Sequence, residues 1–246
     1  MDKYGIIGFP LGHSFSKGFF TEKFKREHIN AEYINFAIEQ VEGLVNLLKE
    51  TPELKGLNVT LPHKQAVIPF LNELSKEAEA IGAVNVIRVR EENGIFHLKG
   101  YNSDIIGFTE SIRPLLQPHH KKALVLGTGG ASKAICAGLE SLGIQWKYVS
   151  RTARPDGLTY EQLDQHTLQD YQVIVNCTPV GMFPNCNECP QLPYHLLTAE
   201  HLLFDLVYNP EETMFMKEGS KQGATTKNGL EMLHLQALAS WKFWNE

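Results

Sequence analysis

The sequence predicts an α/β protein made of two lobes. Short apolar runs alternate with amphipathic helical segments along the chain, which is typical of sheets covered by helices. The alternation is interrupted near Asn102 and then starts again. A length of 246 residues, 43% of them hydrophobic, supplies enough apolar surface for one large domain or two small ones.

In the first lobe, the apolar run 3–8 predicts a buried strand that ends in the turn Gly8-Phe9-Pro10. A helix is predicted over 16–28, with Ser16 as its N-cap, because the phenylalanines of this stretch recur at helical spacing. The other elements expected here are a strand at 32–38, a helix at 41–50, a strand at 57–60, a helix from 63 to about 80, and a hairpin of 83–90 and 95–100 turning at Asn93-Gly94.

In the second lobe, the apolar run 122–126 leads into a glycine turn and then into a helix over 131–142. The pattern also predicts a connecting helix at 104–116, strands at 146–150, 173–177 and 203–207, and an amphipathic helix at 230–244. One face of that last helix would carry Leu233, Ala237, Leu238, Trp241 and Trp244. The alternation of strands and helices predicts parallel sheets with right-handed crossovers in both lobes.

Composition and charge exclude several classes of protein. With 23 Lys and Arg against 28 Asp and Glu, the net charge of -5 gives no overall attraction for nucleic acid or anionic lipid. No apolar run approaches the roughly 20 residues of a membrane span. The chain has only 4 cysteines and starts without the layout of a signal peptide, so we expect a cytoplasmic protein with reduced thiols.

The segment Gly127-Thr128-Gly129-Gly130 predicts a dinucleotide site, because it stands between a strand and a helix. Gly127 would permit the tight turn, and Gly129 would let the backbone approach a pyrophosphate, which the helix N-terminus attracts. Ser132 stands where the usual fingerprint has its third glycine.

The turn after the next strand favours NADP over NAD. An NAD site usually has an acidic residue there, but the sequence reads Ser150-Arg151-Thr152-Ala153-Arg154. Two guanidinium groups in this turn would suit a 2′-phosphate. The alternative is a solvated basic turn without a ligand.

Small polar residues follow the predicted strands of the first lobe. Ser14 and Ser16, in the segment that begins at His13, would face one way in extended backbone and could cradle a carboxylate. Asn58 and Thr60 share one face of a strand. Asn85 follows another apolar segment. Together these groups predict a site for a small, anionic, hydroxylated ligand near the junction of the lobes.

Lys64 and Asp104 are candidates for proton transfer, because reduction of a ketone needs a proton as well as a hydride. A cleft tunes a lysine through desolvation, and a nearby carboxylate orients its amine. The alternative for each is an ordinary surface charge.

These residues resemble the shikimate dehydrogenase family, and the resemblance runs nearly from end to end. Nine segments occur in the family's order, which makes the match specific although each segment alone is weak. They are 8–16, 58–64, 82–85, 102–104, 127–132, 150–152, 176–179, 205–208 and 229–236.

The resemblance implies NADPH-dependent, reversible reduction of 3-dehydroshikimate to shikimate, a step of chorismate and aromatic amino-acid biosynthesis. It implies a substrate-binding α/β domain of residues 1–101, completed by the C-terminal helix in 229–246, and a Rossmann-type NADP-binding domain of residues 102–228. Catalysis is assigned to Lys64 and Asp104. The residues assigned to substrate binding are Ser14, Ser16, Asn58, Thr60, Asn85, Tyr208 and Gln236. The residues assigned to cofactor binding are Gly127, Gly129, Gly130, Ala131, Ser150, Arg151, Thr152, Thr178 and Gly229.

The sequence departs from the family pattern at Tyr101, Ile105 and Glu231. It leaves open a quinate/shikimate dehydrogenase that prefers NAD, a catalytically silent NADP-binding module of the same fold, and a dehydrogenase of similar architecture for another small acid. Cys186 and Cys189 are interpreted as part of a surface loop, and no metal is expected. We expect a small-molecule substrate, no nucleic-acid or membrane partner, and a monomer or homodimer.

Overall fold

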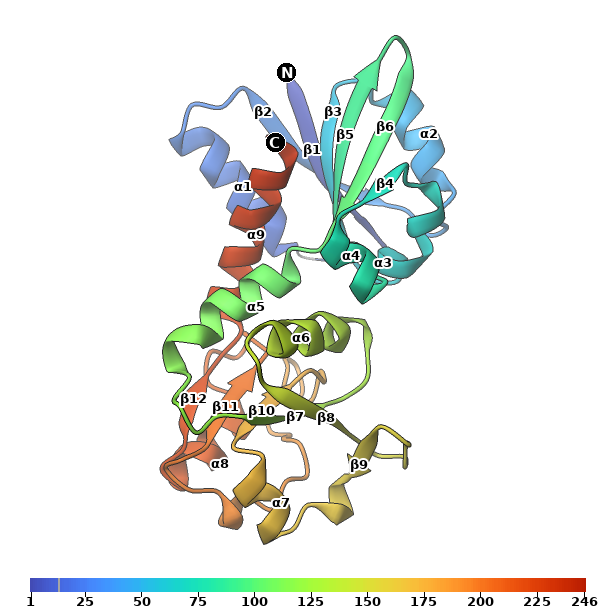
Figure 1. Cartoon of the computed structure of the whole chain (residues 1–246). Helices are drawn as coiled ribbons and strands as arrows, with labels where there is room; N and C mark the ends of the chain where they lie inside the picture. The colour runs from blue at the N-terminus through green and yellow to red at the C-terminus, as the bar shows by residue number, and fades with distance from the viewer. Residues whose placement is uncertain (13) are drawn as a thin grey trace. The chain divides into compact units, whose positions relative to one another are not determined.

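The computed structural model describes residues 1–12 and 14–246, and these residues form two units (Figure 1). Residues 1–103 and 237–246 form the first unit, and residues 104–236 form the second. The predicted segment 229–246 is therefore divided, because its first eight residues, 229–236, belong to the second unit. His13 lies outside the described residues.

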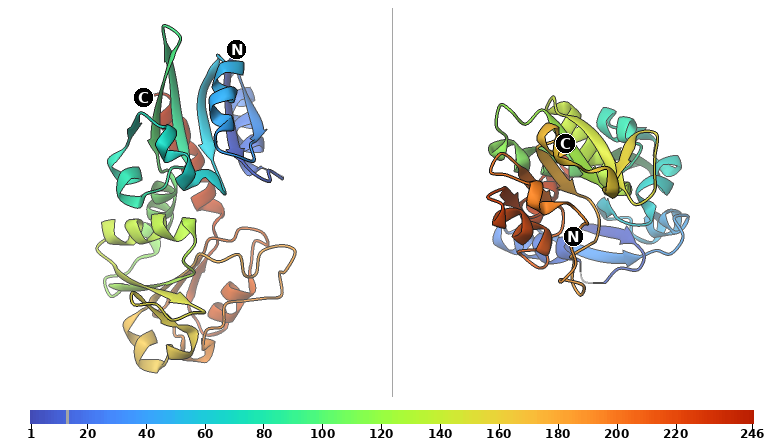
Figure 2. Two further views of the ribbon diagram at one scale, coloured as in Figure 1. Left: turned by 90° about the vertical axis from the view of Figure 1, so that its right-hand side faces the viewer. Right: turned by 90° about the horizontal axis from the view of Figure 1, so that it is seen from below.

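The sheet of the first unit is mixed rather than parallel. Its strands are β1 (Asp2–Gly8), β2 (Ala31–Ala37), β3 (Leu54–Val59), β4 (Glu73–Leu74), β5 (Val86–Glu92) and β6 (Ile95–Tyr101), in the order β2-β1-β3-β5-β6-β4. β1 pairs in parallel with β2 and β3, but β5 runs antiparallel to β3 and β6. The expected parallel sheet is therefore wrong in this unit. The predicted hairpin at Asn93-Gly94, both with positive φ, makes β6 antiparallel to β5 (Figure 2), and β5 itself runs antiparallel to β3.

Among the described residues of the first unit, four helices precede the hairpin. They are α1 (Phe15–Arg26), α2 (Gly43–Glu50), α3 (His63–Ala66) and α4 (Lys76–Ile81), with a 3₁₀ turn at Ile68–Phe70. The single helix predicted from 63 to about 80 is wrong. Pro69 lies in the 3₁₀ turn, and Ser75 starts a new helix by accepting a hydrogen bond from the Ala78 amide at 3.1 Å.

The second unit is a doubly wound parallel sheet, as predicted. Its strands are β7 (Lys122–Leu126), β8 (Gln145–Ser150), β9 (Gly157–Thr159), β10 (Val173–Asn176), β11 (Leu202–Asp205) and β12 (Thr225–Lys227). The order β12-β11-β10-β7-β8-β9 places the first strand of this unit, β7, in the middle of the sheet. Later strands are added first on one side of β7 and then on the other, so the switch point of the sheet lies between β7 and β10. Ligands of such sheets bind at the carboxyl ends of the strands beside this switch point.

The helices of the second unit are α5 (Asp104–Ile112), α6 (Gly130–Ser141), α7 (Gln165–Asp170), α8 (Met214–Lys221) and the first part of α9 (Leu230–Trp244), with 3₁₀ turns at Arg113–Leu115, Tyr160–Gln162 and Tyr194–Leu196. Four of these elements, β9, β12, α7 and α8, were not predicted from the sequence. The two strands are short sheet edges with few apolar residues, so they leave no buried run to detect.

The predicted bounds of the last helix are confirmed, but its predicted apolar face is partly wrong. Ala237 and Trp244 are buried in the first unit, whereas Leu238 is 46% exposed. Trp244 packs flat on Gly56 of β3, where a Cβ atom would stand 2.3 Å from the indole. The aromatic residues around it come from β1, β2 and α1, and Figure 1 shows α1 beside α9. Within the described part of the chain, no helix has the length and apolar character that crossing a bilayer requires.

Two buried histidines of the second unit, His120 and His201, have the same hydrogen-bond arrangement. Each Nδ1 accepts a backbone N–H, from Gln117 at 2.9 Å and from Thr198 at 3.0 Å. Each Nε2 therefore carries the proton and donates it to a backbone carbonyl. Burial lowers the pKa of both rings, because a buried imidazolium loses its hydration.

We expect these two rings to reduce stability in acid. Because their pKa values are lower in the folded protein, the unfolded chain binds more protons below about pH 6.5, and the free energy of unfolding falls as the pH drops through this range. The double variant His120→Asn/His201→Asn keeps an acceptor at the Nδ1 position but does not titrate. Urea unfolding at pH 7, 6 and 5 should show a smaller loss for this variant than for wild type, while the exposed control His195→Asn should follow wild type. Parallel curves for the double variant and wild type would contradict the expectation.

Candidate active site

In the first unit, the two predicted serines lie at the N-terminus of α1. Ser14 is the N-cap, and its Oγ accepts a hydrogen bond from the Lys17 amide at 3.4 Å. The prediction of Ser16 as the cap is wrong, because Ser14 has the extended backbone of a cap and Ser16 lies in the first helical turn. Both serines are half-buried. Two hydroxyls at the positive end of a 12-residue helix form a suitable place for a carboxylate.

Asn58 is buried at the end of β3 and is held from two sides. Its Oδ1 accepts the hydroxyl of Tyr33 at 2.8 Å, and its Nδ2 donates to Oγ of Ser240 at 3.0 Å. Burial raises the pKa of Tyr33 well above its ordinary value, which keeps the phenol a neutral donor, although the Ser16 hydroxyl opposes this rise. The network therefore links residues of α1, β2, β3 and α9 around one amide.

Asn85 continues this network from the other side. Its Nδ2 donates to Oγ of Ser103 at 3.0 Å, and its Oδ1 accepts the Ser103 amide at 2.7 Å. The hydroxyls of Ser103 and Ser240 lie 3.2 Å apart. The structure thus brings Asn58 and Asn85 together and fixes the orientation of both amides. Tyr33, Ser103 and Ser240 were missed as supporting residues because their partners are distant in sequence.

Lys64 lies on the short helix α3, which two hydrogen bonds hold at the carboxyl ends of the strands. His63 is buried, and its Nε2 lies 2.6 Å from the Ile38 carbonyl after β2. The backbone carbonyl of Lys64 accepts the Val84 amide at 2.8 Å, beside Asn85. Thr60, half-buried, follows β3 and precedes this helix. Asp104 is the first residue of α5 in the second unit, and its pairing with Lys64 stays a prediction.

Removing the Tyr33 hydroxyl tests how strongly the network is held. Tyr33→Phe leaves the buried Oδ1 of Asn58 without this donor, which we expect to lower the free energy of unfolding by about 1–3 kcal/mol. Urea unfolding at neutral pH measures the change. The control Ser220→Ala removes an exposed hydroxyl and should change it little. A Tyr33→Phe protein as stable as wild type would mean that the bond contributes nothing.

In the second unit, the predicted glycine turn has the geometry of an anion cradle. Gly127 has φ +90°, and a Cβ atom there would stand 2.7 Å from Cγ2 of Thr178. At Gly129 and Gly130, apart from the neighbouring residues and the backbone of α6, no atom of the described chain lies within 4 Å of where a Cβ would be. The cradle is therefore open at the N-terminus of the 12-residue helix α6. Ser132 is fully buried, and its hydroxyl donates to the Gly129 carbonyl at 2.7 Å.

The basic turn after β8 contains two arginines in different states. Arg154 pairs with Asp156 through two hydrogen bonds, of 2.9 and 3.1 Å, and stacks over the ring of Tyr148. Arg151 is exposed and has no acidic partner among residues 1–12 and 14–246. Arg151 is therefore the better candidate for a phosphate, and the predicted participation of Arg154 is not favoured. Ser150 and Thr152 are joined by a hydrogen bond from the Ser150 hydroxyl to the Thr152 carbonyl.

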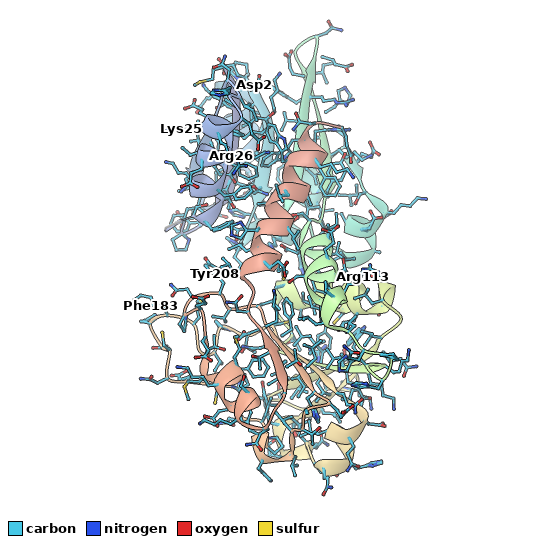
Figure 3. The ribbon with its side chains drawn as sticks, turned by 90° about the vertical axis from the view of Figure 1, so that its left-hand side faces the viewer. Asp2, Lys25, Arg26, Arg113, Phe183 and Tyr208 are labelled. Atoms are coloured by element: carbon cyan, nitrogen blue, oxygen red, sulfur yellow. The ribbon has the colours of Figure 1, made fainter. Side chains whose placement is uncertain are left out.

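Four further predicted residues lie after β10, β11 and β12 or on α9. Thr178 donates its hydroxyl to Oδ1 of Asn176 at 2.6 Å. Gly229 has no space for a side chain, because a Cβ atom would stand 2.2 Å from the Leu206 carbonyl oxygen. Tyr208 is 41% exposed, and Figure 3 shows it with Phe183 on the loops of this unit. Gln236 is buried on α9 and donates to the Leu233 carbonyl at 2.9 Å.

The side chains that depart from the family pattern have structural partners. Tyr101 stacks on Phe243 with ring centroids 4.3 Å apart. Glu231 pairs with Lys227 at 2.7 Å and accepts the Ser111 hydroxyl at 3.2 Å, and both contacts keep its pKa below the usual value. Ile105 is half-buried on α5. In the described part of the chain, no group of three or more His, Cys, Asp or Glu side chains could hold a metal ion.

Comparisons with known proteins agree with this arrangement. The family profile of the shikimate dehydrogenase substrate binding domain matches residues 6–87. The shikimate dehydrogenase (NADP(+)) of Methanosphaera stadtmanae is 34% identical over 259 residues, which cover 98% of this chain and 90% of that protein. The enzyme of the same name from Caldanaerobacter subterraneus is 36% identical over 261 residues, with the same coverage of 98% and 90%.

Solved structures extend the likeness to the whole fold. The shikimate 5-dehydrogenase of Thermus thermophilus, in complex with NADP(H) and shikimate, has a TM-score of 0.84 and 30% identity, covering 99% of this chain and 93% of that one. The 5-ketofructose reductase of a Gluconobacter strain has a TM-score of 0.82 and 27% identity, covering 99% and 92%. Identity of more than 30% to curated relatives over nearly the full length shows that this chain belongs to the shikimate dehydrogenase family.

Proposed function

We propose that this protein is an NADP-dependent shikimate dehydrogenase, which reduces 3-dehydroshikimate reversibly to shikimate in chorismate and aromatic amino-acid biosynthesis. The observation that carries the proposal is the combination of two sites in one chain. The first unit gathers serine hydroxyls and fixed amides, and the second has an open glycine cradle followed by an arginine without an acidic partner. Near full-length relatives that bear this enzyme's name support it.

The residues of the second unit fit NADP. Gly127, Gly129, Gly130 and Ala131 would hold the pyrophosphate at the N-terminus of α6, where the backbone leaves room for it. Arg151, flanked by Ser150 and Thr152, would bind the 2′-phosphate and so select NADP. Thr178 and Gly229 would line the nicotinamide end. Bound NADPH supplies the hydride for the reduction.

The residues of the first unit fit a small hydroxylated acid. Ser14 and Ser16 would hold the carboxylate, with Tyr208 assisting. Fixed amides and hydroxyls would bind the ring hydroxyls, and a substrate that lacks one of these would leave a buried partner unpaired. Lys64 would donate the proton to the developing alkoxide, and Asp104 would orient its amine. The residues proposed for the ring hydroxyls are Asn58, Thr60, Asn85, Asp104 and Gln236.

A second candidate is reduction of a small polyhydroxylated ketone without a carboxylate. The likeness to a 5-ketofructose reductase favours it, because a protein of the same fold is named as a reductase of a different carbonyl compound. The serine pair at the N-terminus of α1 supports the acid instead. All four cysteines are free, which agrees with a cytoplasmic, reducing environment, and we propose a monomer or homodimer.

A spectrophotometric assay tests the proposal. Purified protein mixed with shikimate and NADP should form NADPH, with a higher kcat/KM than for NAD or for quinate. The same protein should be inactive in reducing 5-ketofructose with NADPH. Activity with the ketose, and none with shikimate under either cofactor, would replace the first candidate by the second.

A further inference from the structure

A buried carboxylate, Asp205, lies at the carboxyl end of β11 with both oxygens occupied. It is fully buried, and its Oδ1 accepts the Asn176 side-chain amide at 2.9 Å and the Val207 backbone amide at 3.0 Å. Its Oδ2 accepts the Thr213 hydroxyl at 2.6 Å. Asp205 therefore joins the end of β10, the segment after β11 and the N-terminus of α8.

Asn176 extends this connection into the loop after β10. Its Oδ1 accepts both the backbone amide of Thr178, at 3.0 Å, and the Thr178 hydroxyl, at 2.6 Å. The Thr178 hydroxyl in turn accepts the Val180 amide at 3.3 Å. The loop beside the switch point of the sheet is thus fixed by side chains that all lead back to one carboxylate.

The segment after β11 is fixed from the same point. The Val207 amide donates to Asp205, and the Val207 carbonyl accepts the Gly229 amide at 3.1 Å. Gly229 packs so closely on Leu206 that no side chain fits there. Thr178, Tyr208 and Gly229, the residues placed near the nicotinamide and the substrate under the proposed function, therefore lie on segments that converge on Asp205.

Hydrogen bonds alone stabilise this charge. No basic side chain of the described residues pairs with Asp205, and burial raises its pKa to about 6 against the opposing hydrogen bonds. The titratable groups that it influences are Cys177 and Tyr194, whose pKa values burial raises as well, so both are neutral. Burying a carboxylate without a cationic partner lowers the free energy of unfolding, which indicates that Asp205 has a role beyond stability.

We propose that Asp205 is a positioning residue of the oxidoreductase site, acting through Asn176 and Val207 to hold the two loops at the nicotinamide end of the cofactor. This inference rests on the proposed function. It assigns Asp205 no contact with cofactor or substrate. We expect its effect to be largest at the nicotinamide end, because Arg151 follows β8 and the cradle residue that lies against Thr178 is Gly127, at the end of β7.

The test compares two ligands that share the adenosine half. Asp205→Ala should lower kcat for shikimate oxidation roughly tenfold to a hundredfold, since a misplacement of about 1 Å at a reacting centre has effects of this size. It should weaken NADP binding while leaving the affinity for 2′,5′-ADP within about twofold of wild type. Asp205→Asn should recover most of kcat, because its amide oxygen can accept from Asn176 and Val207 and its nitrogen can donate to Thr213.

Several outcomes would overturn the inference. One is a folded Asp205→Ala protein with wild-type kcat, and another is an equal loss of affinity for NADP and 2′,5′-ADP. The control Asp170→Asn removes an exposed carboxylate of the same unit, paired with Lys122, and should behave as wild type. Wild-type protein without any shikimate turnover would overturn the proposed function, and this inference with it, before any variant is compared.

If Asp205→Ala does not fold, hydrogen exchange on the wild-type protein tests whether the Asp205 network holds the loops. The amides of Thr178, Val180 and Val207 should exchange as slowly as those of the strands, because each donates to this side-chain network. Fast exchange at these three amides would show that the network does not hold the loops.

Discussion

Replacing Lys64 by alanine is expected to lower kcat for shikimate oxidation by roughly 10²- to 10⁴-fold, the range that a positioned general acid or base contributes. Lys64 would pass the proton to or from the ring oxygen, and no other proposed group of the site takes this role. The fold should persist, because helix α3 is held by the backbone carbonyl of Lys64 and by the buried ring of His63. Steady-state kinetics together with circular dichroism check both expectations.

Comparing the change in kcat with the change in KM distinguishes a role of Lys64 in proton transfer from a general electrostatic effect on substrate binding. If Lys64 acts in the chemical step, kcat should fall far more than KM for shikimate rises. The control Lys76→Ala removes an exposed lysine of the same unit, at the start of α4, and should leave both constants unchanged. A Lys64→Ala protein that keeps wild-type kcat would end the proposed role of this residue.

Replacing Arg151 by glutamine is expected to shift the cofactor preference towards NAD. The loss of a charge-assisted hydrogen bond to a phosphate, about 1.5–3 kcal/mol, corresponds to a drop of roughly tenfold to a hundredfold in kcat/KM for NADP. The value for NAD should change by less than about twofold, because NAD has no 2′-phosphate to lose. Initial rates with each cofactor at saturating shikimate give both values.

Arg154 provides a control three residues away. Its guanidinium is already paired with Asp156, so Arg154→Gln should leave the preference for NADP intact. Equal losses in the two variants would indicate that the turn acts through its total charge. A loss in Arg154→Gln alone would assign the phosphate to Arg154 instead.

The elements of the two units differ in how well the sequence predicts them. The glycine turn, its strand and its helix were found because they are contiguous, and the bounds of β7 match the prediction. The edge strands β9 and β12 were missed because they are short and half-exposed. The prediction of one helix from 63 to about 80 was wrong because it rested on hydrophobic periodicity, which does not show that Pro69 and the N-cap Ser75 divide this segment.

In the candidate site too, local motifs could be found from the sequence, whereas contacts between distant segments could not. Sequence motifs singled out Asn58 and Asn85, but not the residues that hold their amides. Tyr33 is 25 positions from Asn58, and Ser240 is 182 positions from it, so only folding reveals these partners. Asp205 and Asn176 had a usable local signal, since each is a polar residue that directly ends a buried strand.

The alternation of strands and helices, the glycine turn and the order of the family's motifs could be predicted without a structure, because each depends on residues that are neighbours along the chain. Other features emerge only in the folded protein. They are the side chains that support the site, the pairing of Arg154 but not of Arg151 with an acidic residue among the described residues, and the buried carboxylate that joins two loops. These features depend on contacts between distant segments, and burial and hydrogen bonding there exist only once the sheets have formed.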